Sequence, residues 1–453
     1  MHVLLTIPHG FALRNAVYST LPDVLAQDQV TAVAAPAMHS ALPSAWHAQA
    51  WPTYRESARA GVLRRAVLTG HMRVHATPGM QRALPRQRGT TRLGPRRLLD
   101  EMGWQLGKTL RTPQHLYTWT QRLERAHRAS STTAAWRAIL ASQRPEVILC
   151  GDQRRPEHIP LRIAARDVGI PCGTVIFSWD NLSSKGRMPC GFDFYLVWSA
   201  HMAHELRRFY PEVPTEAIHV TGTPQFEAYL SSDRVRPRAE FAASIGADPA
   251  VPWLAFCGEG PLTYPDSPQF VSDLVGSSQN LQILLRPTPS DTSERWRSVV
   301  AAHPGRVLWC PPKWQCAQSW EQALPSEPDM AELANLAHHC AACVNIASTL
   351  TLDFAIAGKP SINLAYDTTT PPPLGRPLWE HYFQYDHYRP IVELGAATIV
   401  RQRDQLGAAI QAILATPDAT LATREQLIQM QTDNCIFDVG QRIRAELGRR
   451  SAG

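Results

Sequence analysis

The chain has 453 residues, of which 44% are hydrophobic and 19% charged, and its formal net charge is +6. These values predict two or three globular domains and exclude a disordered or fibrous chain. No stretch suits a transmembrane helix, and the amino terminus lacks the basic start of a signal peptide, so a cytoplasmic protein is expected. Nine cysteines without framework spacing indicate buried reduced thiols.

The amino-terminal half alternates short apolar runs with helical periodicity, which favours a parallel α/β sheet. Proline and polar residues interrupt this pattern between 223 and 238, so we place a first, acceptor-side domain at 1–222. Strands are predicted at Leu4–Ile7, Val147–Cys150, Thr174–Phe177 and Phe194–Trp198, and helices at Leu13–Gln27, Pro160–Val168 and His201–Phe209.

Residues 61–130 of this first domain form a basic insert with 14 Lys/Arg and three Asp/Glu, interleaved with Met, Trp and Leu. Such a segment fits peripheral contact with an anionic bilayer, here the inner membrane, or with a lipid-linked acceptor. A solvated helical insert is the alternative. No RNA-binding signature is present, so nucleic acid is not an expected partner.

The second series of strands and helices predicts a Rossmann-like domain at 223–453 that binds a nucleotide and ends in a terminal helix. The fold class is therefore α/β, with two facing doubly wound domains and a ligand cleft at the carboxyl ends of their strands. Strands are predicted at Trp253–Cys257, Gln282–Leu285, Val307–Cys310, Cys343–Ile346 and Ser361–Ala365, and helices at Gln405–Leu414 and Leu421–Leu447.

The most informative segment is CVNIASTLTLDFAIAGKPSINLAY, residues 343–366. A strand runs into a helix that begins at Ser348 and Thr349, and such a helix end offers N–H groups and partial positive charge to an anion. Asp353, one turn further on, shares a face with Thr349. This arrangement suits a nucleotide, with its diphosphate on the helix end and its ribose on the acid. An ordinary capped helix is the alternative.

Two further strand tips carry residues of the expected donor site. Arg286 follows one strand and offers a charged fork to the diphosphate. We expect Arg286→Ala to weaken nucleotide binding and to leave folding nearly unchanged. Glu259 follows another strand between two glycines, in a turn where the backbone can approach a ligand. A surface ion pair and a solvated turn are the respective alternatives. The pair of glycines lacks the third glycine of a dinucleotide fingerprint.

Several motifs resemble a known group of enzymes. RPTP and NIASTLTLDFAIAGKPSINLAYD resemble the carboxyl-terminal half of GT-B glycosyltransferases, especially polyol-phosphate (CDP-glycerol type) and bacterial surface-polysaccharide transferases. IPHG with Arg14-Asn15, SWDNLSSKG and VTGTPQF are similar to GT-B-like proteins of cell-surface glycan clusters. The frequent His-Pro of the family is Arg286-Pro287 here.

The resemblance implies a glycosyltransferase that moves a sugar from a nucleotide-sugar donor to a surface-glycan or lipid-linked acceptor. His9 or Asp180 would be the base that deprotonates the acceptor, with Asp152 next in line. No metal or other cofactor is expected, because a helix end and an arginine can supply the positive charge. Donor-binding residues would be Gly10, Arg14, Glu259, Arg286, Ser348, Thr349 and Asp353, and acceptor-binding residues Asn181 and Lys185.

Three alternatives remain open from the sequence. A polyol-phosphate transferase would use a CDP-activated donor. A sugar-nucleotide 2-epimerase would need no acceptor. A non-catalytic GT-B-like protein would bind a nucleotide without turnover. The nucleobase, the sugar and the acceptor are not encoded in any motif that we recognise.

Overall fold

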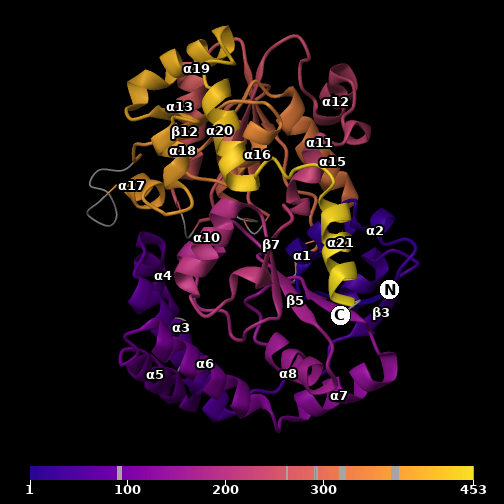
Figure 1. Ribbon diagram of the computed structural model, residues 1–453. Coiled ribbons are helices and arrows are strands. Elements are labelled where there is room, and N and C mark those ends of the chain that lie inside the picture. Colours follow the sequence, from indigo (N-terminus) through magenta and orange to yellow (C-terminus); the bar gives the residue numbers. More distant parts are fainter. Residues whose placement is uncertain are drawn as a thin grey trace. The chain divides into compact units, whose positions relative to one another are not determined.

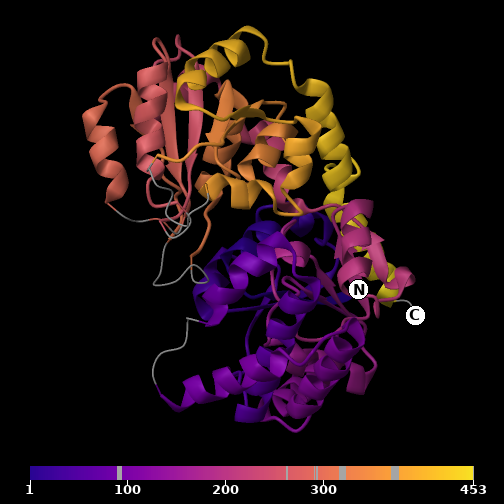
Figure 2. The same ribbon diagram turned by 90° about the vertical axis from the view of Figure 1, so that its left-hand side faces the viewer.

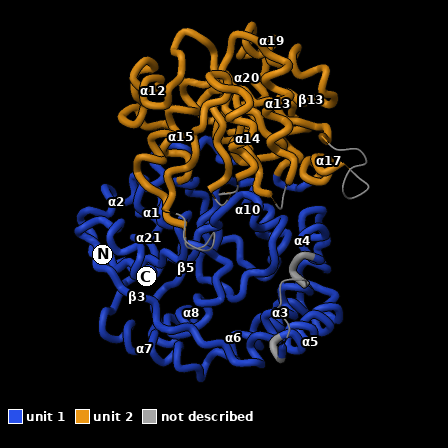
Figure 3. Tube along the Cα trace, turned by 180° about the vertical axis from the view of Figure 1, so that it is seen from behind, with its two compact units in different colours: residues 1–224, 385–387, 431–453 blue, residues 225–384, 388–430 orange. Residues whose placement is uncertain are grey.

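The structure is a computed structural model that describes residues 1–88, 94–261, 264–289, 291, 294–315, 323–368 and 377–451 (Figure 1). The chain divides into two compact units, coloured separately in Figure 3. Unit 1 comprises residues 1–224, 385–387 and 431–453, and unit 2 comprises residues 225–384 and 388–430.

Unit 1 is built on a seven-stranded sheet in which all paired strands are parallel, in the order β3-β2-β1-β4-β5-β6-β7. The strand order reverses beside β1, whose Leu5 pairs with Ala32 on one side and with Leu149 on the other. Both faces of β1 and β4 are buried, as expected of strands covered by helices on each side. The strands are β1 His2–Ile7, β2 Gln29–Ala34, β3 His47–Ala50, β4 Val147–Cys150, β5 Cys172–Val175, β6 Phe194–Val197 and β7 Ile218–Val220.

The basic insert forms a group of helices in which α3 packs against α5 and α6 (Figures 1 and 2). Helices α3 and α5 lie so close that a Cβ added at Gly103 would come within 2.6 Å of the Arg65 Cβ. The insert therefore has its own packed interior. The helices of unit 1 are α1 Gly10–Val17, α2 Leu21–Val24, α3 Ala58–His75, α4 Pro78–Arg88, α5 Pro95–Gly107, α6 Pro113–His127, α7 Ser131–Gln143, α8 His158–Val168, α9 Asn181–Ser184, α10 Ala200–Phe209 and α21 Val439–Ser451.

The terminal helix α21 belongs to unit 1, whereas the sequence analysis grouped it with the second domain. Its buried residues Val439, Ile443 and Leu447 pack it into unit 1, where it contacts α2 and β4. Arg444 adds an ion pair to Asp28, with Nε 2.7 Å from the carboxylate. The chain thus returns to unit 1 after unit 2 is complete.

Unit 2 repeats the architecture with six parallel strands in the order β10-β9-β8-β11-β12-β13. Its core includes Trp253, Leu284, Cys343 and Phe354. The strands are β8 Trp253–Gly258, β9 Gln282–Pro287, β10 Val307–Trp309, β11 Ala342–Asn345, β12 Ser361–Leu364 and β13 Thr398–Val400. The helices are α11 Glu227–Leu230, α12 Arg238–Ile245, α13 Ser267–Ser277, α14 Arg295–Ala302, α15 Glu327–His339, α16 Leu350–Ile356, α17 Leu378–Phe383, α18 Arg389–Leu394, α19 Leu406–Ala415 and α20 Leu421–Thr432.

The predicted fold class is confirmed: the chain contains two doubly wound parallel sheets and a carboxyl-terminal helix. Over the described residues, no helix is both long and apolar enough to cross a membrane. The eight cysteines whose surroundings are described are all buried and free of disulfide bonds.

Candidate functional site

The topology brings predicted site residues to the point in each sheet where the strand order reverses. In unit 1, His9 follows β1 and Asp152 follows the neighbouring strand β4. In unit 2, Glu259 follows β8, while Ser348 and Thr349 follow the neighbouring strand β11. Open α/β sheets bind their ligands outside the carboxyl ends of the strands at this reversal. Each unit therefore has one candidate site.

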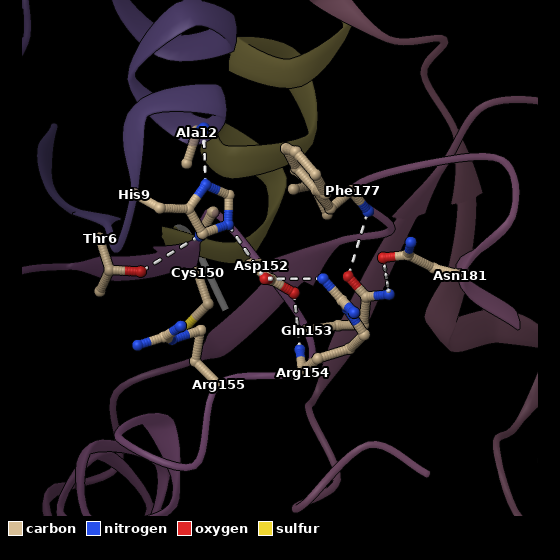
Figure 4. A network of polar contacts seen from close by, with 12 residues as sticks. Thr6, His9, Ala12, Cys150, Asp152, Gln153, Arg154, Arg155, Phe177 and Asn181 are labelled. Atoms are coloured by element: carbon tan, nitrogen blue, oxygen red, sulfur yellow. Dashed lines mark hydrogen bonds and ion pairs between the residues drawn. The ribbon is translucent and has the colours of Figure 1, made fainter. Parts of the chain in front are cut away.

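In unit 1, His9 and Asp152 form a buried pair (Figure 4). The His9 Nε2 lies 3.1 Å from the Asp152 Oδ2, and both side chains are almost fully enclosed. The other ring nitrogen, Nδ1, accepts the backbone N–H of Ala12 at 3.2 Å and caps helix α1. Because Nδ1 is an acceptor, the proton of the neutral ring is on Nε2, which donates to Asp152.

Asp152 is held as an anion by its surroundings. Burial alone would raise its pKa, but Arg154 and His9 together bring the pKa well below the usual range of an aspartate. The Arg154 backbone N–H donates to Oδ1 at 2.8 Å, and its guanidinium lies 3.5 Å from Oδ2. The carboxylate thus fixes the His9 ring in one tautomer and one orientation.

This geometry bears on the role predicted for His9. Both ring nitrogens are engaged inside the protein, one with Asp152 and one with the Ala12 N–H. A general base needs a lone pair within reach of the proton that it removes. In this conformation His9 serves as a helix cap, and action as a base would require the cap to break.

Asp180 lies at the start of α9, close to the predicted acceptor residues. Its carboxylate contacts the Lys185 Nζ at 2.9 Å, the Ser184 Oγ at 3.1 Å and the Asn181 side-chain amide at 2.9 Å. Burial would raise the Asp180 pKa, but Lys185 and then His387 lower it far below its ordinary value. Because its pKa is low, the carboxylate is charged at neutral pH. The side chain is 21% exposed, so the carboxylate can still contact solvent.

The structure brings Asp180, Asn181 and Lys185 together in one cluster. Asn181 is buried, and its Oδ1 accepts from the Gln153 Nε2 at 3.0 Å, so its amide is largely used within the protein (Figure 4). Lys185 is 41% exposed and is the more accessible of the two predicted acceptor residues. Gln153 also accepts the Phe177 N–H at 3.1 Å, which fixes the loop that carries Asp180.

Two predicted donor-binding residues of unit 1 lie on α1, directly after His9. Gly10 is the first residue of the helix and is buried. Arg14 donates from Nε to the Asn15 Oδ1 at 3.1 Å, and its guanidinium lies 5.4 Å from the centre of the Phe11 ring. Both residues therefore share an element with His9.

In unit 2, Glu259 lies directly after β8. Its Oε1 is buried and has no hydrogen-bond partner among the described residues. Burial raises the Glu259 pKa to about 7, although Arg295 opposes this shift. Arg295 holds the surrounding loop by donating to the carbonyls of Tyr264 at 2.8 Å and Pro265 at 2.7 Å, and to the Glu259 carbonyl. A carboxyl group with this pKa can give or take a proton near neutral pH.

Ser348 and Thr349 lie in the turn between β11 and α16, as predicted. The Ser348 N–H donates to the Asn345 Oδ1 at 2.9 Å, and the Leu350 N–H reaches the Ser348 Oγ at 3.4 Å. Thr349 stands at the N-cap of α16 without a side-chain capping bond. Asp353 is buried on the same helix, with its Oδ1 3.5 Å from the Gln225 Nε2.

A buried polar network that includes Asn345 stabilises this turn. Asn345, Thr351, Asn363 and Tyr388 hydrogen-bond to one another at distances of 2.9–3.2 Å. All four side chains are almost fully enclosed. Since a buried polar group costs stability unless it is satisfied, this network fixes the β11–α16 turn in one geometry.

Arg286 differs from the expectation of an open charged fork. It is only 6% exposed, and its Nη2 lies 2.9 Å from each Asp329 oxygen. Its Nη1 lies 3.5 Å from a Glu332 oxygen. We therefore expect Arg286→Ala to destabilise the fold, contrary to the sequence-based expectation, because the substitution would leave two buried carboxylates without this cation. Its predicted part in donor binding stays a prediction.

The sequence analysis missed the residues that orient these side chains. Gln153, Arg295 and Tyr388 lie far in the sequence from the groups they contact. Arg154 is the exception, since it stands two residues after Asp152 and a basic residue beside an acid is a readable signal. Within the described residues, no group of three or more His, Cys, Asp or Glu side chains is placed to hold a metal ion.

Comparisons with known proteins agree at the level of the fold. No family model and no curated protein matches the sequence. A solved glycosyltransferase from Rickettsia africae matches 100% of this chain and 98% of its own, with TM-score 0.54 and 9% identity. Glycosyltransferase VinC, in complex with dTDP, matches 100% of both chains, with TM-score 0.50 and 16% identity. UDP-GlcNAc 2-epimerase from Neisseria meningitidis, bound to UDP-GlcNAc, covers 99% of this chain and 100% of its own, with TM-score 0.53 and 10% identity.

The chain therefore has the GT-B fold, with two Rossmann-like units, each built on a parallel sheet. Both glycosyltransferases and UDP-GlcNAc 2-epimerases occur among the solved structures that resemble it. Identities of 9–16% carry no information about the substrate.

Proposed function

We propose that this protein is a glycosyltransferase that moves a sugar from a nucleotide-activated donor to a glycan or lipid-linked acceptor. The observation that carries the proposal is the placement of polar and titratable side chains at the strand-order reversal of both sheets: His9 and Asp152 in unit 1, and Glu259, Ser348 and Thr349 in unit 2. A transferase has two substrates to bind, and each Rossmann-like sheet offers one ligand site.

Unit 2 is the proposed donor unit. The β11–α16 turn presents the Ser348 and Thr349 hydroxyls over a rigid polar network, and Glu259 lies at the end of the adjacent strand β8. Hydroxyl groups and a carboxyl group near neutral pKa suit the sugar and the phosphates of a nucleotide sugar.

Unit 1 is the proposed acceptor unit, with Asp180 as the base. Of the two predicted bases, Asp180 keeps partial exposure, whereas both His9 nitrogens are occupied. Lys185 beside it can hold an anionic group of the acceptor. The low pKa of Asp180 keeps it ionised at every physiological pH, although it also makes the carboxylate a weak base.

A sugar-nucleotide 2-epimerase is the second candidate, and Glu259 favours it. An epimerase exchanges a proton within the nucleotide-sugar site and needs no acceptor base. Glu259 has a pKa raised to about 7, so it can serve as both acid and base in unit 2 without help from unit 1.

Two measurements on the purified full chain test the proposal. The first is a thermal-shift screen with uridine, cytidine, guanosine and thymidine diphosphates. The nucleotide that raises the melting temperature most identifies the nucleobase, because a ligand that binds only the folded state stabilises it. Mass spectrometry then follows nucleotide sugars of that base with and without a mixture of glycan and lipid-linked acceptors. The proposal predicts donor consumption only with an acceptor. An isomer formed without acceptor identifies an epimerase, transfer of a polyol phosphate from a CDP donor identifies a polyol-phosphate transferase, and binding without turnover contradicts both enzymes.

We also propose that transfer needs no divalent ion, because the Ser348 and Thr349 hydroxyls at the β11–α16 turn can donate hydrogen bonds to the leaving phosphate. Transfer should continue in excess EDTA at the rate measured without it. Activity that is abolished by EDTA and restored by Mg²⁺ or Mn²⁺ would contradict this.

A further inference from the structure

Unit 1 contains a cavity of about 380 Å³ between α6, α8 and the loops before β6 and β7. Pockets that hold small ligands typically measure 300–1,000 Å³. Five arginines and two glutamates line this one, together with Tyr117, Phe192, Tyr195 and Tyr210. The arginines are Arg125, Arg128, Arg162, Arg166 and Arg187.

This cavity is separate from the candidate site at His9 and Asp180. Its lining residues 187–192 precede β6, and 210–214 precede β7, so the cavity lies toward the amino ends of these strands. His9 and Asp152 follow the carboxyl ends of β1 and β4 in the same parallel sheet. The two sites therefore occupy opposite edges of the sheet.

Arg187 and Arg162 are the two arginines of the lining that are buried, and Arg187 has an unsatisfied nitrogen within the described part of the chain. Arg187 is 6% exposed, its Nε donates to the Thr120 Oγ1 at 2.9 Å, and its Nη2 pairs with Glu212. Its Nη1 is buried without any hydrogen-bond partner among the described residues. A buried guanidinium nitrogen without a partner costs stability, which a bound anion at this wall would recover.

Two of the other four arginines, Arg125 and Arg128, are not fully compensated by ion pairs. Arg125 is exposed and has no ion pair within the described part of the chain. Arg128 is 62% exposed and shares its partner Asp167 with Arg137. Arg166 pairs with Glu124, and Arg162 with Asp193. Positive charge thus remains at the cavity after every ion pair is counted.

We propose that this arginine cavity binds a phosphate-bearing ligand. Guanidinium groups match the planar, multiple acceptors of phosphate, and several of them converge here from α6, α8 and the loop before β6. The aromatic side chains of the lining supply an apolar wall for the group that bears the phosphate. The proposal does not depend on the transferase activity proposed above.

Calorimetry with inorganic pyrophosphate at constant ionic strength tests the site in the full chain. The arginine variant is Arg125→Gln, which removes an exposed charge that no ion pair uses. We expect it to weaken binding by about tenfold, the effect of losing one charged hydrogen bond. The matched control is Arg122→Gln, on the same helix but outside the lining, which should bind like the wild type.

A second variant should change affinity in the opposite direction. Glu212→Gln removes the carboxylate that neutralises Arg187 while it keeps the size of the side chain. We expect it to bind pyrophosphate severalfold more tightly, a gain that a folding defect would not produce. The proposal is overturned if the wild type does not bind at millimolar pyrophosphate, if both arginine variants weaken binding equally, or if Glu212→Gln leaves it unchanged.

A vesicle assay distinguishes a lipid phosphate from a soluble phosphate ligand. If the natural ligand is a lipid phosphate, binding to phosphatidic acid vesicles should fall in Arg125→Gln and not in Arg122→Gln. If the ligand is soluble, only the calorimetric affinity should separate the two variants. Both results support the cavity as a phosphate site.

Discussion

The two sheets of this protein share a topology and differ in the chemistry at their reversal points. In unit 1, Asp152 accepts hydrogen bonds from the His9 ring and from the Arg154 backbone N–H, and the other ring nitrogen of His9 accepts the Ala12 N–H. In unit 2 the Oε1 atom of Glu259 is buried and has no hydrogen-bond partner among the described residues. The same strand order therefore carries one fixed hydrogen-bonded pair in unit 1 and one carboxyl group with a raised pKa in unit 2.

This difference separates positioning from reactivity. A paired carboxylate such as Asp152 has a pKa far below neutrality, whereas an unpaired buried one such as Glu259 titrates near pH 7. Titration near the working pH is what acid and base catalysts require. His9 and Asp152 therefore have a structural part in the present conformation, and Glu259 alone of these carboxyl groups meets the pKa requirement. Asp180 is a candidate base because its side chain is 21% exposed, not because of its pKa.

The largest expected effect comes from removing the acting base. A transferase that uses Asp180 should lose about 10²–10⁴-fold in turnover in Asp180→Asn, with nucleotide affinity kept. An epimerase that uses Glu259 should show the same loss in Glu259→Gln. His9→Asn serves as the matched variant, because asparagine also caps helices. Steady-state rates and nucleotide titrations measure all three. A loss confined to His9→Asn would show that the cap opens and that His9 is the base.

The next largest effect concerns Arg286, whose ion pairs to Asp329 and Glu332 are buried in unit 2. Arg286→Ala should lower the free energy of unfolding by about 3–5 kcal/mol, because Asp329 and Glu332 would stay buried without it. Urea denaturation measures this. Arg297→Ala is the control, since Arg297 is 80% exposed and its ion pair should contribute little. Equal stability of the two variants would show that Asp329 and Glu332 pair with other groups when Arg286 is removed.

The opposite pKa shifts of the two carboxylates predict opposite pH dependences of stability. The folded pKa of Glu259, about 7, lies above the ordinary 4.5, so its contribution to stability is complete below pH 4.5 and is lost as pH rises through 7. Asp152 has a lowered folded pKa, so its contribution is present above pH 3.8 and is lost as pH falls below that value.

Substitution by the neutral amide separates the two. Glu259→Gln should remove a decline in unfolding free energy of about 2–3 kcal/mol between pH 5 and pH 8, since one pKa unit corresponds to about 1.4 kcal/mol. Asp152→Asn should lower stability throughout that range. Denaturation curves at pH 5, 6.5 and 8 distinguish these outcomes. A pH slope that persists in Glu259→Gln would place the titrating group elsewhere.

Much of the fold could be predicted from the sequence, because buried parallel strands are continuous apolar runs. β1, β4 to β6 and β8 to β12 lie where such runs indicated them, within one or two residues at each end. β2 was not predicted, although five of its six residues are buried. β3, with the sequence HAQA, was missed because it is a mostly exposed edge strand without an apolar pattern. β7 and β13 have three residues each, too few for periodicity to register.

The site was predictable only where its residues directly follow strands. His9, Glu259 and Ser348 were found because a strand tip can be read from the sequence. The pairing of Arg286 with Asp329 could not be read, since 43 residues separate them and the arginine alone also fits an open anion site. Arg187 and its cavity were missed for the same reason, because the arginines of the lining come together only when α6 and α8 pack in the folded unit.

The smallest expected effect concerns the helical insert, which unit 1 has and unit 2 lacks. Some of its 14 basic residues are already paired, as Arg64 is with Glu56 and Arg65 with Asp100. On α5, however, Leu98 and Met102 are 67% and 47% exposed, one helical turn apart. An apolar pair beside basic residues is suited to an anionic membrane surface. Arg86, Arg88, Arg92 and Arg96 lie outside the described side chains.

We therefore predict weak, reversible attachment of the full chain to anionic vesicles, measured by co-sedimentation. Each basic residue near such a surface contributes on the order of 1 kcal/mol. Attachment should fall as salt rises, because the Debye length shortens from about 10 Å at 0.1 M to about 3 Å at 1 M. Leu98→Ser should weaken it by about 1 kcal/mol, whereas Leu421→Ser, at a leucine of unit 2 that is 40% exposed, should not. Equal binding to neutral and anionic vesicles, or none to either, would mean that the insert is only a solvated helical layer, and the acceptor would then be sought among soluble molecules.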